Sequence, residues 1–169
     1  NLNLKFVKGK KMAIVGKNGS GKSTFIKLLC RLYDVTEGCI KLNGIDIRKY
    51  DYKEYCDLFA VVFQDFSIFD FPMGENIAAA SIYDKKRVKE AIDKVGLNTL
   101  EDKLTQGLDT IVGKECCSDG VNFSGGEKQK IAIARAIHKD APFVIMDEPT
   151  AALDPEAEAE VFEGFDRMV

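Results

Sequence analysis

The sequence predicts an α/β domain with a mainly parallel central sheet, a small antiparallel hairpin and an inserted α-helical subdomain. Three observations support this fold class. Short apolar runs of strand length alternate with segments of helical spacing, which is typical of a parallel sheet covered by helices. An Asn-Gly pair inside an alternating segment indicates a tight hairpin. A long central stretch, between Ser67 and Asp119, changes in character to helical segments.

Size and composition indicate one globular domain with a hydrophobic core. The chain has 169 residues, of which 46% are hydrophobic and 30% are charged, and this balance separates it from disordered proteins. No apolar run approaches the roughly 18–20 residues needed to cross a bilayer, and the N-terminus does not resemble a signal peptide. We therefore expect any membrane association to require a partner. Five cysteines without a C-x-x-C pair favour reduced thiols in a cytosolic compartment.

The first elements are a strand, a loop and a helix. The apolar run 11–15 ends at a glycine and predicts a buried strand. Residues 16–21 form a glycine-rich loop, and residues 23–32 show helical spacing. This order places the loop between a strand end and a helix start.

A hairpin and a second strand follow. Residues 39–47 alternate in polarity on either side of Asn43-Gly44, the strongest short-range hairpin signal. The apolar run 59–63 predicts another buried strand, which ends before Gln64.

Residues 66–119 are expected to form the helical subdomain. It interrupts a nucleotide-binding core made of residues 1–65 and 120–169. Three segments within the subdomain are expected to be helices or turns: 76–81, 85–95 and 101–104. Beyond the subdomain, three further elements are predicted: a helix over 125–137, a buried strand over 143–146, and a last helix with Asp154 as N-cap and Pro155 at its first position.

The loop at residues 16–23 matches the pattern G-x-x-x-x-G-K-[ST] in full. Its glycines allow backbone N–H groups to turn inward around phosphate oxygens, at the positive end of the following helix. Lys22 would contact the β- and γ-phosphates of a nucleotide, and the Ser23 hydroxyl would bind Mg²⁺. We assign nine residues to nucleotide binding: Gly16, Lys17, Asn18, Gly19, Ser20, Gly21, Lys22, Ser23 and Thr24.

Two acids, Asp147 and Glu148, follow the predicted strand 143–146. An enzyme with this phosphate loop needs a carboxylate at the tip of a neighbouring strand to hold Mg²⁺, usually through water, and Asp147 fits that role. Glu148 would then lie near the γ-phosphate, where a carboxylate can orient and deprotonate the attacking water.

Residues 124–127, Ser-Gly-Gly-Glu, begin the helix predicted after the subdomain and have the pattern of a capping box. Together with the phosphate loop and the paired acids, they resemble the signature motif of the ATP-binding-cassette (ABC) superfamily, whose usual form is Leu-Ser-Gly-Gly-Gln. Phe123 stands in place of the leucine and Glu127 in place of the glutamine. The charge of Glu127 must point away from the phosphates or be paired, and we consider Lys128 and Lys130 as partners.

The resemblance implies further roles. Gln64 resembles the glutamine that contacts Mg²⁺ and the attacking water, and Asp154 belongs to a segment that resembles the D-loop. The metal ligands are then Ser23, Gln64 and Asp147 (through water), and the catalytic residues are Glu148, Gln64 and Lys22. Because cassettes of this family pair head to tail, three residues would contact the γ-phosphate of ATP held by a second cassette: Ser124, Gly125 and Gly126.

The exporter branch in particular is indicated by three segments: 44–47, 74–77 and 110–113. The implied function is Mg²⁺-dependent ATP hydrolysis that drives transport, at the cytoplasmic face of the cell membrane. The implied partners are a second cassette and transmembrane domains, and no nucleic acid is expected. A soluble non-transport ABC ATPase of the translation-factor type is the alternative. The apolar run 66–73 is interpreted either as a surface facing the membrane partner or as core of the subdomain.

Two groups of the family pattern are not found in the sequence: an adenine-stacking aromatic residue upstream of the first strand, and a histidine downstream of the last helix. The only histidine, His138, lies near the end of the helix 125–137, where we expect it to interact with the helix dipole. We therefore expect a cassette cut short at both ends that is nearly inactive by itself.

Overall fold

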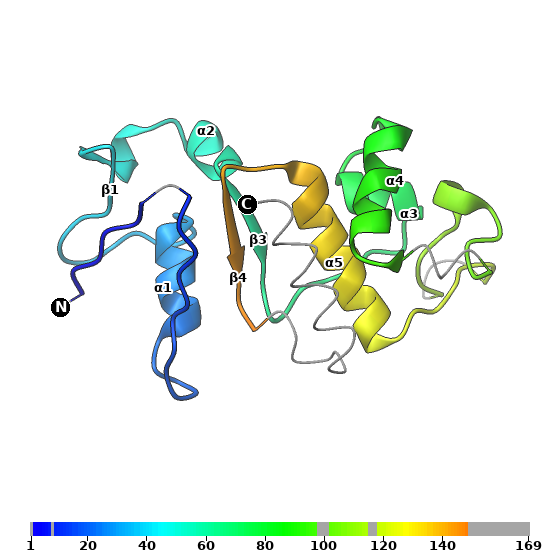
Figure 1. Cartoon of the computed structure of the whole chain (residues 1–169), viewed down its shortest axis with the longest axis horizontal. Helices are drawn as coiled ribbons and strands as arrows, with labels where there is room; N and C mark the ends of the chain where they lie inside the picture. The colour runs from blue at the N-terminus through cyan, green and yellow to red at the C-terminus, as the bar shows by residue number, and fades with distance from the viewer. Residues whose placement is uncertain (1, 8, 98–101, 115–117, 149–169) are drawn as a thin grey trace.

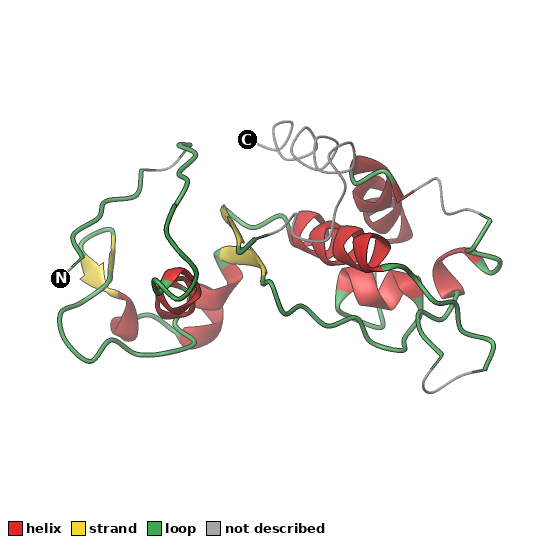
Figure 2. Ribbon diagram, turned by 90° about the horizontal axis from the view of Figure 1, so that it is seen from below, coloured by secondary structure: helices red, strands yellow, loops and turns green. Residues whose placement is uncertain are grey.

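The structure, a computed structural model, describes residues 2–7, 9–97, 102–114 and 118–148. A pair of strands, β3 (Phe59–Val62) and β4 (Phe143–Met146), lies between two groups of helices (Figure 1). Helix α1 (Lys22–Leu29) lies on one side of the strands and α5 (Gly125–Lys139) on the other, as a second view also shows (Figure 2). The predicted fold class is confirmed.

Strands β3 and β4 pair in parallel, with Phe59 opposite Phe143 and Val62 opposite Met146. Successive side chains of a strand point to opposite faces. Phe59 therefore packs in the core on the α1 side, whereas Ala60 and Val62 pack in the core that contains α5. The two strands join two separate cores.

The first core contains α1, the short helix η1 (Ile47–Lys49) and α2 (Tyr52–Asp57). Tyr55 connects these elements, because its hydroxyl donates to the Leu29 carbonyl oxygen at 2.7 Å and its ring lies 5.2 Å from that of Phe59. Next to this core, β1 (Lys41–Leu42) and β2 (Ile45–Asp46) form the predicted antiparallel hairpin. Its two turn residues, Asn43 and Gly44, have φ values of 51° and 82°, as a type I′ turn requires.

The second core contains α3 (Met73–Ala78), α4 (Lys85–Lys94), η3 (Gly107–Asp109) and α5. Ile77, Val88 and Ile131 are fully buried where these helices meet. Within the described ranges, no helix combines the length and the apolar character that a membrane span needs.

Residues 11–15 do not form the predicted strand. They are an exposed loop, and Val15 is 93% exposed. An apolar run shows only that its residues favour a strand, whereas a strand also needs a neighbour for its backbone hydrogen bonds. No strand among the described residues forms a sheet ladder with this run.

Three predicted helices agree with the structure to within three residues at each end: 23–32, 85–95 and 125–137. Helix α3, in contrast, begins and ends earlier than the predicted 76–81. Pro72 is its N-cap, and Ala79, with a φ of 53°, ends it. Of the predicted turn at 101–104, Asp102 and Lys103 form a turn, and Glu101 lies outside the described residues. The last helix, with Asp154 and Pro155, also lies outside them.

Candidate nucleotide-binding site

The loop at residues 16–21 needs glycine at defined positions. Gly19 and Gly21 have φ values of 77° and 92°, which side chains other than hydrogen rarely tolerate. A Cβ atom on Gly16 would lie 2.6 Å from the Ser20 hydroxyl oxygen. Gly21 is the N-cap of α1, without a side-chain capping bond, and the first turn has no acid. The first N–H groups of a helix have no acceptor within it, so α1 begins as a potential anion-binding end.

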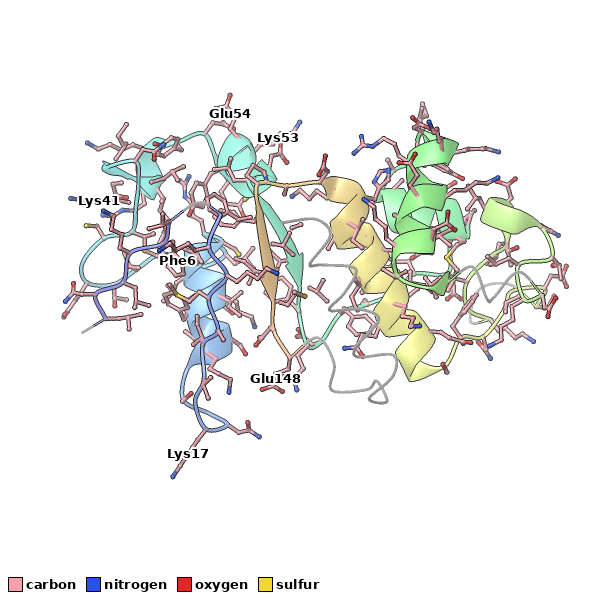
Figure 3. All side chains as sticks on the ribbon, viewed as in Figure 1. Phe6, Lys17, Lys41, Lys53, Glu54 and Glu148 are labelled. Atoms are coloured by element: carbon pink, nitrogen blue, oxygen red, sulfur yellow. The ribbon has the colours of Figure 1, made fainter. Side chains whose placement is uncertain are left out.

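Lys22 connects this loop with the end of β4. Its ammonium group donates to the carbonyl oxygens of Gly16 at 3.0 Å and Lys17 at 3.5 Å. The same group lies 3.7 Å from Oε1 of Glu148. Figure 3 shows Glu148 at the end of β4 and Lys17 at the tip of the loop, pointing away from the rest of the protein. A cation and a carboxylate are thus brought together from segments far apart in the sequence.

Asp147 and Gln64 follow the ends of the two parallel strands. The backbone N–H of Asp147 donates to the Val62 carbonyl oxygen at 2.9 Å, which continues the ladder by one residue. Asp147 is 5% exposed, whereas Gln64 is exposed. Ligands of open α/β sheets bind at the carboxyl ends of parallel strands, and both side chains lie at that edge.

Glu148 has a φ of 50°, a conformation uncommon for a non-glycine residue. This backbone turn comes directly after the ladder ends at Asp147, and the Glu148 side chain is 39% exposed while it contacts Lys22. Non-glycine residues in this region often occur at functional sites. The geometry leaves the Glu148 carboxylate accessible to a ligand bound at Lys22.

The start of α5 has the predicted capping box. The Ser124 hydroxyl accepts from the Glu127 N–H at 3.2 Å, and Oε2 of Glu127 accepts from the Ser124 N–H at 2.7 Å. Oε1 of Glu127 pairs with Lys103 at 2.5 Å. The charge of Glu127 is therefore paired, as expected, but by Lys103, which lies 24 residues upstream in the sequence. Such a contact depends on how the chain folds, so neighbouring residues in the sequence do not indicate it.

The pKa of Glu127 reflects this environment. Burial acts to raise the pKa, but hydrogen bonds from Lys103 and from the Ser124 backbone outweigh burial and hold the pKa below its ordinary value. The carboxylate is therefore charged at neutral pH.

The structure separates the predicted site residues into two groups. One group lies where α1 approaches the ends of the strands, and it comprises the loop residues together with Lys22, Asp147 and Glu148. The other group lies at the start of α5, across the β3–β4 pair (Figure 1), and comprises Ser124, Gly125 and Gly126. Asp154 lies outside the described residues. Thr24 is exposed, and Ser23 is half-buried beside Lys22.

The run 66–73 has a divided character. Phe66 and Ile68 pack against the second core and Met73 is buried, but Phe69 and Phe71 are each 55% exposed. The two exposed rings line a pocket of ≈ 280 Å³ together with Glu75, Asn76, Ala79, Ala80, Ser81 and Arg135.

Sequence reasoning missed three side chains that organise these segments: Asn76, Lys103 and Arg135. Arg135 donates to the carbonyl oxygens of Asn76 at 2.8 Å and Ser67 at 3.2 Å. None of these contacts joins neighbours in the sequence, so no local pattern indicates them.

Comparison with known proteins identifies the family. The family model described as ABC transporter matches residues 1–151. The chain belongs to the ABC transporter family. The phosphate loop, the paired acids and the signature segment all lie within the matched range.

Individual members of the ABC transporter family are similar over nearly the whole chain. The subtilin transport ATP-binding protein SpaT of Bacillus subtilis is 42% identical over 98% of this chain. The ATP-dependent lipid A-core flippase of Salmonella typhimurium is 40% identical over 99% of it. The chain spans only 27% and 28% of the lengths of these two relatives.

A solved structure supports the same conclusion. A bacterial Atm1-family ABC exporter with ATP bound is 34% identical, with a TM-score of 0.80. The match covers 89% of this chain and 26% of that protein.

Proposed function

We propose that this chain is the ATP-binding and ATP-hydrolysing part of an ABC exporter. The observation that carries the proposal is the contact of Lys22, in the phosphate loop, with Glu148 at the end of β4. It places a phosphate-binding cation beside a carboxylate that can accept a proton from water. The named relatives include a transport ATP-binding protein, a flippase and an exporter, so the translation-factor alternative is not favoured.

The residues present fit Mg²⁺ as the cofactor. The Ser23 hydroxyl, the Gln64 amide and the Asp147 carboxylate are the oxygen donors that Mg²⁺ prefers. No group of three or more His, Cys, Asp or Glu side chains gathers into a metal site in the described part of the chain. Bound Mg²⁺ would neutralise negative charge on the phosphates.

The proposed roles of the protein groups follow from their places. Residues 16–24 bind the phosphates, and Lys22 exchanges its contacts with the loop carbonyls and Glu148 for phosphate oxygens. Glu148 accepts a proton from the attacking water, and Gln64 orients that water. We propose that residues 66–119 form the helical subdomain. Its helices α3 and α4 pack against α5 and β3 in the second core.

The proposed partners are a second cassette and transmembrane domains, at the cytoplasmic face of the cell membrane. Within one chain, the start of α5 lies across the strands from the phosphate loop (Figure 1). We propose that Ser124, Gly125 and Gly126 instead contact ATP held by the partner cassette, with Asp154 nearby. The pocket at Phe69 and Phe71 is proposed to face the transmembrane domains.

A mixing experiment tests this arrangement. In the full-length protein, Lys22→Ala removes the phosphate-binding cation and Ser124→Arg blocks the signature segment, so each variant alone should lose ATP hydrolysis. A mixed dimer of the two variants contains one composite site with an intact Lys22 and an intact Ser124. We expect mixing to restore about a quarter or more of the parent rate per mixed dimer, because charge-assisted bonds to phosphate of about 1.5–3 kcal/mol each are recovered at that site.

The control is each variant mixed with itself under the same conditions. No recovery in the mixture, with confirmed subunit exchange, would contradict the arrangement across two cassettes. Equal ATP affinity of Lys22→Ala and the parent would contradict the assignment of the phosphate loop.

We also propose that the 169-residue chain alone hydrolyses ATP slowly. Its Lys22 is engaged by two carbonyls and Glu148, and the composite site needs a second cassette. Steady turnover by this chain, at a rate independent of its concentration, would contradict that proposal.

A further inference from the structure

Lys103 contacts the start of α5 from a segment 24 residues upstream of Glu127. Its ammonium group lies 2.5 Å from Oε1 of Glu127 and 5.9 Å from the centre of the Phe123 ring. The second carboxylate oxygen, Oε2, accepts the Ser124 N–H at 2.7 Å. Lys103, Glu127 and the Ser124 backbone thus form a continuous series of contacts, which we call the Lys103 bridge.

Glu127 has opposite effects on the helix and on a phosphate. A carboxylate in the first turn stabilises the positive end of a helix dipole. The same negative charge repels a phosphate that approaches this end, and the repulsion grows as water is excluded. The Glu127 side chain is 19% exposed, so solvent screens it only in part. An unpaired Glu127 would therefore weaken phosphate binding at Ser124.

Lys103 removes this conflict. It brings a positive charge to Oε1 without occupying the Ser124 hydroxyl or the N–H groups of the first turn. Packing over the Phe123 ring holds the ammonium group in place by a cation–π contact. Phe123 itself is 6% exposed and belongs to the second core. The bridge is consequently tied to a rigid part of the fold.

We infer that Lys103 is a positioning residue for the signature segment. Through Glu127, it neutralises the negative charge at the start of α5 and fixes the carboxylate against the Ser124 N–H, so that residues 124–126 can receive the phosphate of ATP bound by a second cassette. The inference rests on the proposed function. Lys103 acts through Glu127 and does not itself contact the reacting atoms.

The test measures steady-state ATP hydrolysis by the full-length protein as a function of ATP concentration. Lys103→Met removes the charge and keeps a long side chain, and it should raise the KM for ATP about three- to tenfold, with a smaller change in kcat. Lys103→Arg, which keeps the charge, should restore the KM to within about twofold of the parent.

A double-mutant cycle separates electrostatic positioning from support of the fold. In a Glu127→Gln background no negative charge needs to be neutralised, so Lys103→Met should change the KM by less than about twofold. If Lys103 only supported the local structure, its loss would have the same effect in both backgrounds. Equal effects would overturn the inference.

Two further variants make the outcome decisive. Lys86 forms an exposed pair with Glu90 at 3.9 Å, far from α5's first turn, and Lys86→Met is the matched control. A Lys103→Met KM equal to that of Lys86→Met would overturn the inference. Glu127→Gln alone should not raise the KM, since it removes the repulsive charge and the amide oxygen can still accept the Ser124 N–H. A threefold rise would overturn the inference, even if Lys103→Met does not fold. Absence of ATP hydrolysis in the parent would instead contradict the proposed function.

Discussion

At the scale of single residues, burial governs the charge state of His138 in the last turn of α5. Burial lowers its pKa below the ordinary value of 6.5, the Arg87 guanidinium lowers it further, and Asp84 acts in the opposite direction. The carbonyl oxygen of His138 accepts a hydrogen bond from Arg87 at 3.0 Å. The predicted position of His138 near the end of the helix is confirmed, and its interaction with the helix dipole stays a prediction.

This shift predicts how stability depends on pH. Because the pKa is lower in the folded state, the unfolded state binds more protons between the two pKa values, and stability rises with pH through that window. The contribution is fully present above about pH 6.5 and falls as the pH drops toward the folded pKa. Urea unfolding of the parent and of His138→Gln at pH 5.5 and 7.5 measures it. The parent should gain more stability between these pH values than the variant, and an equal gain in both would contradict the assignment.

Among single residues, the sequence predicts the features that depend only on residues nearby in the chain. The spacing of Gly16, Gly21 and Lys22 is set by the loop itself. Glu148 contacts Lys22 in the structure, and its place beside bound phosphate stays a prediction. The partner of Glu127 could not be predicted, because Lys103 reaches it through a folded loop.

At the scale of elements, Asn76 joins the segment after β3 to α3 and α5. Its side-chain amide donates to the carbonyl oxygens of Phe69 at 2.9 Å and Phe71 at 3.0 Å, and its oxygen accepts the Phe69 N–H at 3.1 Å. Arg135 of α5 donates to the same oxygen at 3.3 Å. Asn76 is 3% exposed, so these groups have little access to water.

Removal of this side chain should therefore be costly. Asn76→Ala removes the acceptor of the Phe69 N–H and of one Arg135 N–H, and the carbonyl oxygens of Phe69 and Phe71 each lose one of their donors. We expect a loss of about 1–3 kcal/mol in the free energy of unfolding. Ser81→Ala, which removes one exposed hydrogen bond to Glu75, is the control and should change stability by less than about 0.5 kcal/mol. Urea denaturation measures both. Similar values for the two variants would show that the network is not stabilising.

Elements were predictable where the pattern includes its own partner. The hairpin at Asn43-Gly44 pairs within itself and was predicted. The strand at residues 59–63 was predicted from its apolar composition. Residues 11–15 look alike in composition, but a strand depends on a neighbour that no local pattern supplies. Helix α2 was missed, although Asp51 accepts the Glu54 N–H, and an acid followed three residues later by Glu is a recognisable start signal.

At the scale of the whole molecule, the two ends of the proposed mechanism are divided between two cores. Helix α1, which follows the phosphate loop, packs in the first core, and Phe123, beside the start of α5, packs in the second. The parallel strands carry Asp147 and Glu148 between them (Figure 1). This division fits the proposal that the phosphate loop and the start of α5 are each completed by a second cassette.

Glu148→Gln in the full-length protein tests whether Glu148 is the general base for ATP hydrolysis, as proposed. The amide keeps the size and the contact region of the side chain but cannot accept the proton. Glu54→Gln, on α2 at the opposite end of the first core (Figure 3), is the matched control and should behave as the parent.

The measurement pairs steady-state ATP turnover with retention of radiolabelled ATP after rapid gel filtration. For Glu148→Gln, we predict that turnover falls about 10²- to 10⁴-fold, whereas the protein retains ATP in a closed dimer. Turnover within a few-fold of the parent, or loss of ATP binding together with turnover, would contradict the assigned role of Glu148.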